Sequence, residues 1–404
     1  MNMINRLLKL VALSLVVVLL ATSCTKKKKE EKMGEVINLD KVDPFSEKGI
    51  LSLMELTSQW QIDNLEHVMV LPNGTIEPLT THNWVRATFL SGMMAYYDVT
   101  ADEDIFNFVY NLAEEVDFKL GERPRHADEF AIGRVYTDLY LKTRNDTILA
   151  DMINRIDGII EDPRRGPEFG WDGENNWSWC DALFMAPPAW LKLYTSTGKR
   201  KYLHEMDIRF WDTYDHLYSK EDSLFYRDAR FIWDKDGNGL KTENGKKIFW
   251  GRGNGWVVGG LTDILTYLPG DYHHRSRYKQ LFEEMIEKIA SLQGDDGMWR
   301  ASLLDYEQYP EKEFSASAFF TYAMAWGINH KILDHDTYWP HIEKAWEGLV
   351  ACIQPDGKIG YVQRVGADPA SVKAEDTMEY GTGAFLLCSK EMFEIIEREN
   401  SSKN

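Results

Sequence analysis

The sequence predicts an all-α fold, an (α/α)6 barrel of helical hairpins that carries one small β-hairpin insertion. Along most of the chain the apolar residues recur at spacings of three and four, which is the periodicity of amphipathic helices. A turn motif, Tyr-x-x-Thr followed by a polar stretch and a new amphipathic segment, occurs at residues 97–100, 140–143 and 194–197. Weaker copies of this junction lie at residues 267–278 and 328–338. Repetition of helix, turn and helix on this scale predicts stacked helical hairpins.

The choice between an open solenoid and a closed ring depends on how these hairpins are connected. An open solenoid would be a binding protein of the tetratricopeptide type, in which repeats keep a regular length. Here the intervals between the threonines of the motif differ, and the connections are long, rich in glycine and contain tryptophan. Five or six hairpins of this kind favour a closed double ring, in which the starts of the inner helices converge on one cleft.

The segment from residue 218 to residue 250 interrupts the helical pattern. It reads FYRDARFIW and then DKDGNGLKTENGKKIFW, which predicts a β-hairpin carried on the helical frame. Asp234, Asp236 and Asn238 resemble the start of a calcium-binding loop, but Gly245 occupies the twelfth position, where the bidentate glutamate belongs. We therefore expect a polar turn there and no metal site.

The first residues of the chain are expected to lie outside the folded domain. Residues 1–24 contain two basic residues, an apolar run too short to span a bilayer and then small residues, which is the pattern of a secretory signal. Ala21, Thr22 and Ser23 directly precede Cys24, an arrangement that resembles the lipobox of bacterial lipoproteins. Cys24 is therefore the expected lipidation site, and an uncleaved anchor helix is the alternative.

These signals predict three regions and a location. Residues 1–24 are the signal peptide, residues 25–44 with their run KKKKEEK form a flexible tether, and residues 45–398 form the barrel domain. A lipid on Cys24 would make the protein a membrane-anchored lipoprotein of a bacterial envelope, facing the periplasm or the cell surface. The lipid would then be its only contact with the membrane.

Composition narrows the classes of ligand. The 404 residues carry a formal net charge of −18, which argues against a nucleic-acid partner because phosphate binding needs a basic face. The 14 tryptophans favour a cleft with flat walls, on which sugar rings pack. Apart from Cys24, the cysteines are Cys180, Cys352 and Cys388, an odd number without close pairs, so neither a disulfide framework nor a zinc site is expected.

One carboxylate stands among aromatic and apolar residues in the stretch WSWCDALFMAPP, residues 177–188. Asp181 follows Trp177 and Trp179 and precedes an apolar run. A poorly solvated acid has a raised pKa, which suits it to donating a proton near neutral pH. Asp181 also occupies the position of a helix N-cap, so a purely capping role is the alternative.

Two further segments offer polar groups of the same kind. Asp128, in RPRHADEFAIG, precedes an apolar helical face, and it too can be an N-cap. The segment FWGRGNGW sets Arg252 between Trp250 and Trp256, with three glycines. Arg252 can grip a carboxylate with two hydrogen bonds, and the tryptophans can stack on a ring. The alternative is a helix-start loop pinned by aromatic packing, with Arg252 salt-bridged to a protein acid.

Taken together, ADEFAIG, WCDALFMAPP and WGRGNGW, in that order, resemble motifs of the unsaturated glucuronyl and rhamnogalacturonyl hydrolases of glycoside hydrolase families 105 and 88, with family 105 the closer. The resemblance runs from about residue 57 to residue 394. It implies an (α/α)6-barrel catalytic domain and a hydrolase that acts on 4,5-unsaturated uronic acids. An upstream polysaccharide lyase leaves such residues at the non-reducing ends of its products.

The resemblance also implies an unusual reaction. The enzyme hydrates the C4=C5 enol-ether bond: a carboxyl group protonates C4, water adds at C5, and the resulting hemiketal opens and releases the neighbouring sugar. Asp181 matches the proton donor, and Asp128 matches a second essential aspartate. Residues that match others lining the substrate subsite are Trp179, Met185, Trp250, Arg252 and Trp256. Acid–base hydration of this kind requires no metal and no organic cofactor.

The chain departs from the family pattern before the glycine-rich motif. Family members usually carry a histidine in that tyrosine-rich strand, whereas this chain has Arg227, Asp228 and Arg230. Glu129 stands where another aspartate is common. Arg227 and Arg230 are expected to bind substrate, and two extra arginines favour a more anionic one, sulfated or carrying a second uronate.

One electrostatic conflict and three alternatives accompany this hypothesis. A helix dipole would favour the ionised form of Asp181, so burial and the like charge of Asp128 must outweigh it. The alternatives are an inverting glycosidase of saturated oligosaccharides on the same fold, a noncatalytic glycan-binding lipoprotein, and a polysaccharide lyase on a related helical barrel.

Overall fold

The structure is a computed structural model that describes residues 39–165 and 177–403. The predicted signal peptide, Cys24 and most of the predicted tether lie outside the described residues. Two compact units are distinguished, residues 1–42 and residues 43–404, and the first is described only around the 3-10 turn Leu39–Lys41. Among the described residues, no helix combines the length and the apolar character needed to cross a bilayer.

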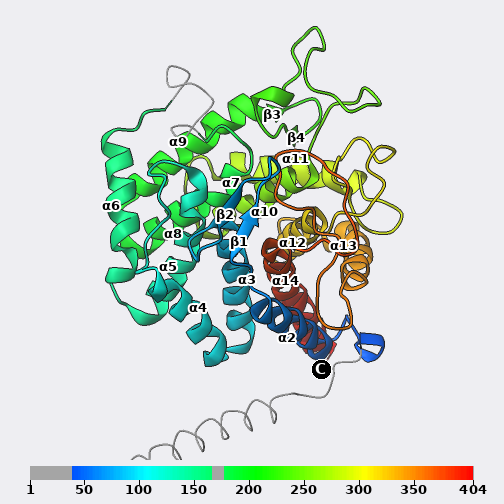
Figure 1. Cartoon of the computed structure of the whole chain (residues 1–404), viewed down its shortest axis with the longest axis horizontal. Coiled ribbons are helices and arrows are strands. Elements are labelled where there is room, and N and C mark those ends of the chain that lie inside the picture. The colour runs from blue at the N-terminus through cyan, green and yellow to red at the C-terminus, as the bar shows by residue number, and fades with distance from the viewer. Residues whose placement is uncertain (1–38, 166–176, 404) are drawn as a thin grey trace, which may run out of the picture. The chain divides into compact units, whose positions relative to one another are not determined.

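Six inner helices of the second unit form a closed ring within the described part of the chain (Figure 1). Each packs against the next, and the last packs against the first. In order they are α3 (Trp84–Thr100), α5 (Ala131–Thr143), α8 (Pro187–Thr197), α10 (Gly251–Tyr267), α12 (Phe314–Asn329) and α14 (Glu379–Lys403). The predicted (α/α)6 barrel is confirmed, and the open solenoid is excluded because α14 contacts α3.

An outer layer of helices covers this ring. Each outer helix packs on an inner one, and α2 packs on α14, so the first and last long helices of the unit lie side by side (Figure 1). The outer helices are α2 (Glu47–Asp63), α4 (Glu103–Glu115), α6 (Thr147–Glu161), α9 (Arg200–Leu217), α11 (Arg275–Ser291) and α13 (His335–Val350). The short elements are β1 (Val68–Val70), β2 (Ile76–Pro78), η2 (Ala127–Phe130), α7 (Ala182–Met185), β3 (Tyr218–Ser219), β4 (Leu224–Phe225) and η4 (Ala229–Phe231).

The repeated Tyr-x-x-Thr motif ends three of the inner helices. Thr100, Thr143 and Thr197 each donate a hydrogen bond to the carbonyl four residues earlier. Each hydroxyl also accepts from the backbone N–H two residues later, at 3.3, 3.3 and 3.4 Å. The residue after each threonine adopts the left-handed conformation that ends a helix.

The opposite end of the ring, where the inner helices begin, is called the mouth here. Trp84 and Tyr380, near the starts of α3 and α14, stack there with ring centroids 5.4 Å apart. The Arg252 guanidinium, in the first turn of α10, lies 4.8 Å from the Tyr380 ring. The starts of α3, α10 and α14 therefore meet at one common end, in agreement with the predicted convergence of the inner helices.

A buried ion pair joins the first and last inner helices at the mouth. Arg86 Nη2 donates to Glu379 Oε1 at 2.8 Å, and the two side chains are 6% and 0% exposed. The same carboxylate accepts from the Glu66 backbone N–H at 3.1 Å. This pair thus holds α3 against α14, which closes the ring, and Glu379 also holds the residue that precedes β1.

Replacing Arg86 with methionine is expected to lower the free energy of unfolding by about 3–5 kcal/mol, because it leaves a buried carboxylate without its partner. Urea unfolding followed by circular dichroism measures this difference. The matched control is Lys279→Met, which removes an exposed pair with Glu283 on α11 and should change stability by less than about 0.5 kcal/mol. Equal losses of unfolding free energy in the two variants would contradict the stabilising role of the buried Arg86–Glu379 pair.

The predicted insertion hairpin is present but short. β3 and β4 pair antiparallel over two residues each, with Tyr218 opposite Phe225. Beyond it the expected polar turn is closed by Asp234. Its Oδ1 accepts from the backbone N–H groups of Asp236 and Asn238, each at 2.9 Å. These bonds use the Asp234 carboxylate to shape the turn.

The β1–β2 hairpin was not predicted, although the sequence contains its signal. Asn73-Gly74 lies between two apolar stretches, and Gly74 has φ +83°, the left-handed conformation that such a turn requires. The hairpin leaves Val68, Val70 and Ile76 49%, 54% and 66% exposed. The hairpin belongs to the connection from α2 to α3, and Glu66, just before β1, binds Glu379 at the mouth.

Candidate active site

Asp181 lies directly before α7, a helix of one turn at the mouth side of α8. Its side chain makes no capping hydrogen bond, so the capping alternative does not describe this carboxylate. Because a single turn carries only a small dipole, the expected conflict between dipole and proton donation is weak. Burial raises the pKa of the Asp181 carboxyl, and the nearby charge of Asp128 raises it further, against the opposing effect of Arg227.

Two polar side chains contact the Asp181 carboxylate. Arg227 Nε lies 3.3 Å from Asp181 Oδ2. The Cys180 thiol donates to the same oxygen at 3.6 Å. Burial and the adjacent Asp181 carboxylate raise the pKa of Cys180 well above its ordinary value, so its thiol stays neutral. Cys180 is therefore a buried, unreactive group, as the sequence indicated.

Asp128 lies within the η2 turn, which packs against α7. It is not an N-cap: the cap is His126, whose Nδ1 accepts from the Asp128 backbone N–H at 3.3 Å. Arg123 Nη2 lies 3.4 Å from Asp128 Oδ2. Burial raises the pKa of Asp128, and Arg123 and Arg227 oppose this shift. The His126 ring also lies 4.5 Å from the Trp179 ring, which joins the first two motifs.

The segment with the unusual arginines runs alongside the Asp181 motif. Trp179 forms an antiparallel bridge with Asp228, and the Cys180 N–H donates to the Arg227 carbonyl at 2.8 Å. Asp228 accepts from Arg227 Nη1 at 2.9 Å, and from Arg230 Nε and Nη2 at 2.8 Å each. Although burial raises it, the pKa of Asp228 is held below its ordinary value by these arginines.

Both arginines of this segment have an acidic partner within the protein, and their binding of substrate stays a prediction. Two N–H donors of Arg230 and one of Arg227 bind Asp228, while the Arg230 side chain remains 56% exposed. Arg227 instead joins two acids, Asp181 and Asp228. Arg227 is thus a partner of the predicted proton donor as well as a predicted substrate ligand.

The third motif forms the start of α10 and reaches the second. A Cβ atom at Gly253 would lie 3.0 Å from Cys180 Sγ, so any other residue there would require Cys180 to shift. Arg252 is fully buried, and its Nη1 and Nη2 donate to the carbonyls of Gln363 and Arg364 at 2.5 and 2.9 Å. Among the described residues it forms no salt bridge with an acid, contrary to the alternative interpretation. Arg252 Nε has no hydrogen-bond partner among the residues that the structure describes.

The remaining predicted ligands are buried around these groups. Trp250 donates through Nε1 to Gln363 Oε1 at 3.0 Å, and the Arg252 guanidinium lies 4.5 Å from its ring. Trp256 is fully buried against Phe184, with ring centroids 4.7 Å apart. Met185, on α7, is 2% exposed. Neither tryptophan of the third motif presents an open face, so stacking of Trp250 or Trp256 on a sugar stays a prediction.

Sequence analysis missed the residues that hold these groups in place. Gln363 binds Trp250 and Arg252, and the Tyr380 hydroxyl donates to the Gln363 carbonyl at 2.5 Å. No motif marks Gln363. Arg123 does carry a signal, because an arginine five residues before a buried aspartate is a plausible counterion.

Comparison with known proteins decides the family. A model of glycosyl hydrolase family 88 matches residues 53–396. The chain belongs to this family. The resemblance stated from the motifs is confirmed, and this family 88 member is a glycoside hydrolase with the expected helical barrel.

Two relatives of the family 88 chain are named unsaturated 3S-rhamnoglycuronyl hydrolase. The one from Formosa agariphila is 38% identical over 326 residues, which cover 79% of this chain and 86% of the relative. The one from Alteromonas sp. strain LOR is 34% identical over 412 residues, which cover 95% and 98%. A solved structure with the same fold is described as a polysaccharide lyase. It is 30% identical, has a TM-score of 0.74, and is matched over 98% of its length and 87% of this chain.

Proposed function

We propose that this family 88 hydrolase removes 4,5-unsaturated uronic acid from the non-reducing end of lyase-generated oligosaccharides by hydrating the C4=C5 bond. The observation that carries the proposal is Asp181. It is a carboxyl group whose pKa is raised by burial and by the charge of Asp128, next to one arginine at the mouth of the barrel. The names of both relatives support the same substrate class.

In the proposed reaction, the protonated Asp181 gives its proton to C4, and the developing positive charge at C5 is shared with the ring oxygen. Water then adds to C5 and returns a proton to the Asp181 carboxylate, which acts as general base in this step. The hemiketal opens by breaking the bond between C5 and the ring oxygen, which leaves a ketone at C5 and a hemiacetal at C1. This hemiacetal collapses to an aldehyde and releases the neighbouring sugar with a free hydroxyl group. Asp128 orients the sugar and keeps a negative charge near Asp181.

The substrate carboxylate needs cationic partners in a protein of strongly negative net charge. Arg252 Nε is buried and lacks a hydrogen bond in the described structure, whereas Arg227 Nε already lies 3.3 Å from the Asp181 carboxylate. A uronate carboxylate bound at Arg252 Nε would give this donor a charge-assisted hydrogen bond, which is among the strongest kinds. This supports an anionic sugar as the ligand of the site.

The test is a panel of lyase-digested polysaccharides of pectic, ulvan-like and glycosaminoglycan type. Hydration destroys the conjugated double bond, so near-ultraviolet absorbance should fall on at least one digest. The saturated oligosaccharides of the same polysaccharides are the control and should remain intact. Folded protein that leaves every digest unchanged, or that cleaves the saturated control as an inverting glycosidase would, contradicts the proposal.

A second candidate function is favoured by one observation, the similarity to a structure described as a polysaccharide lyase. A lyase creates the double bond that a hydratase consumes. The same absorbance would therefore rise with time on undigested uronate polysaccharide. The sign of the absorbance change separates the two functions in a single assay.

We also propose that residues 1–24 are a signal peptide, that Cys24 carries a lipid, and that residues 25–44 tether the barrel to a bacterial envelope. The small residues before Cys24 and the charged run after it support this assignment. Incorporation of a labelled fatty acid into the wild-type chain but not into Cys24→Ser tests it. Equal labelling of both chains would refute lipidation at this cysteine.

A further inference from the structure

One aspartate and two histidines from different parts of the chain form a cluster between two outer helices. Asp207 lies on α9, and His273 and His274 directly precede α11. One carboxylate oxygen and one nitrogen of each imidazole all lie within 4.8 Å of one another. Asp207 is buried, His274 is half-buried and His273 is exposed, so one side of the cluster is open to solvent. The sequence did not indicate it, because Asp207 and His274 are 67 positions apart.

The Asp207 carboxylate is buried without a permanent cation beside it. The Tyr278 hydroxyl and Trp211 Nε1 donate to its Oδ1 at 2.9 and 3.1 Å, and both are neutral donors. His274 Nδ1 lies 2.8 Å from Oδ2, and this histidine is a cation only when protonated. No lysine or arginine of the described residues pairs with Asp207, and the nearby Arg277 guanidinium lies over the Trp211 ring instead. Buried charges in proteins are paired or coordinate metals, so Asp207 calls for a cation.

Two imidazoles and one carboxylate are a donor set that suits a divalent transition metal such as zinc. Tyr278 and Trp211 bind Oδ1 of Asp207 and leave Oδ2 as the ligand, which they orient in the way that outer hydrogen bonds orient metal ligands. The side chain of His274 does not cap α11, so its ring is available to the cluster. The start of α11 carries about half a positive charge, which the full negative charge of Asp207 outweighs.

The geometry requires one small adjustment. Zinc bonds of about 2.1 Å in a tetrahedral arrangement place the ligand atoms roughly 3.4 Å apart. The exposed His273 ring therefore has to turn inward, and its exposure leaves it free to do so. Water can fill the fourth position from the open side of the cluster.

We propose that Asp207, His273 and His274 bind one divalent transition metal ion, with zinc the expected ion, and that this ion joins α9 to the start of α11. The sequence-based expectation of no zinc site concerned the cysteines, and the cluster uses none of them. The reaction proposed above requires no metal, so the role of this ion is structural.

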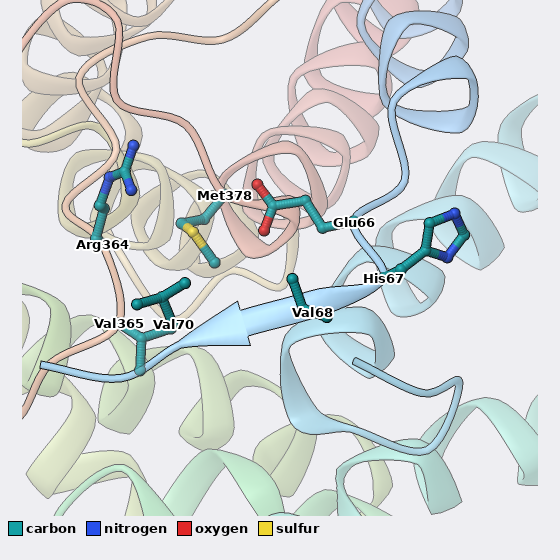
Figure 2. Close-up of a pocket in the computed structure, with 7 residues that line it drawn as sticks. All are labelled: Glu66, His67, Val68, Val70, Arg364, Val365 and Met378. Atoms are coloured by element: carbon teal, nitrogen blue, oxygen red, sulfur yellow. The ribbon is translucent and has the colours of Figure 1, made fainter. Parts of the chain in front are cut away.

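The cluster is separate from the proposed active site. Helix α10 begins at the mouth and ends at Tyr267, and the connection that carries His273 and His274 follows that end. The mouth has a pocket of its own, of 280 Å³, lined by Glu66, Val68 and Arg364 among others (Figure 2). The cluster contributes no residue to that pocket. Metal binding can therefore be measured without substrate, and its outcome does not depend on the proposed function.

The experiment is a calorimetric titration of zinc chloride into the full chain, purified without a histidine tag and treated with a chelator. Wild type is expected to bind about one zinc ion per chain at this site, and zinc should raise its midpoint of thermal unfolding, because a ligand of the folded state stabilises that state. His273→Ala removes an exposed ligand and should unfold as wild type does when zinc is absent. It should bind zinc at least about tenfold more weakly and lose the rise in midpoint.

His335→Ala is the matched control. His335 is an exposed histidine on α13 with two acidic neighbours, Asp336 and Glu399, but it lies outside the cluster. This variant should bind zinc and respond to it as wild type does. Absence of zinc binding by wild type overturns the proposal, and so does equal zinc affinity of wild type and His273→Ala.

Discussion

Asparagine in place of Asp181 is expected to lower kcat by roughly 10²- to 10⁴-fold, the contribution typical of a positioned general acid or base. The amide keeps the size of the side chain but cannot give a proton to C4 or accept one from water. KM should change little, because substrate binding is assigned to other groups. The loss of near-ultraviolet absorbance of an accepted substrate gives both constants.

The control for this substitution is Asp215→Asn on α9, an aspartate with a 71% exposed side chain. It removes one carboxylate from the same chain and should leave kcat unchanged. Thermal unfolding followed by circular dichroism should show both variants folded. If Asp181→Asn keeps full activity, the proton comes from another group. If neither wild type nor Asp215→Asn turns over substrate but both bind glycan, the result supports the alternative of a noncatalytic binding protein.

Replacing Arg227 with glutamine is expected to move the alkaline limb of the pH profile to higher pH. Donation requires protonated Asp181, so the rate falls as pH rises through its pKa. Arg227, 3.3 Å from Asp181, and Arg252 favour the ionised form, whereas Asp128 disfavours it. Removal of one cation therefore raises the pKa, by about 1–3 units for an aspartate beside an arginine. Plots of kcat/KM against pH report this limb for the free enzyme.

Two further variants test whether the positive charge of Arg227, and not the shape of its side chain, sets the alkaline limb. Arg227→Lys keeps the cation and should leave the limb closer to that of wild type. Arg230→Gln removes an arginine that binds Asp228 rather than Asp181, so the limb should move less than in Arg227→Gln. An alkaline limb that is the same in Arg227→Gln and wild type would show that Arg227 does not control the proton donor. If both glutamine variants keep the same dependence of KM on substrate charge as wild type, Arg227 and Arg230 do not bind anionic groups of the substrate.

Local patterns in the sequence were sufficient to predict the frame of this protein. The threonine turns predicted the hairpins because each turn is made by contacts within a few residues of Thr100, Thr143 or Thr197. The raised pKa of Asp181 was predictable for the same reason, since the aromatic and apolar residues beside it along the chain are themselves buried. The β1–β2 hairpin also has a local signal, in Asn73-Gly74.

The partners of the arginines could not be predicted in this way. Arg252 binds carbonyls more than a hundred residues away, in a segment without any motif. Any backbone carbonyl can accept such a bond, so residue type carries no information about it. The division of Arg227 between Asp181 and Asp228 likewise depends on the bridge between Trp179 and Asp228, which only the folded chain creates.

The seam between α2 and α14 has a consequence for biosynthesis. Asn400 Nδ2 donates to Glu47 Oε1 at 2.9 Å across this seam, and Arg86 on α3 binds Glu379 on α14 beside it, so these contacts join residues 353 and 293 positions apart. A chain emerging from the ribosome can form its middle hairpins early, whereas the first inner helix must wait for the last. The wall of the mouth that carries Gln363 and Tyr380 is likewise among the last parts to be made. A nascent chain that lacks its final helix therefore has Asp181 in place but no complete site around it, and activity appears only when synthesis is finished.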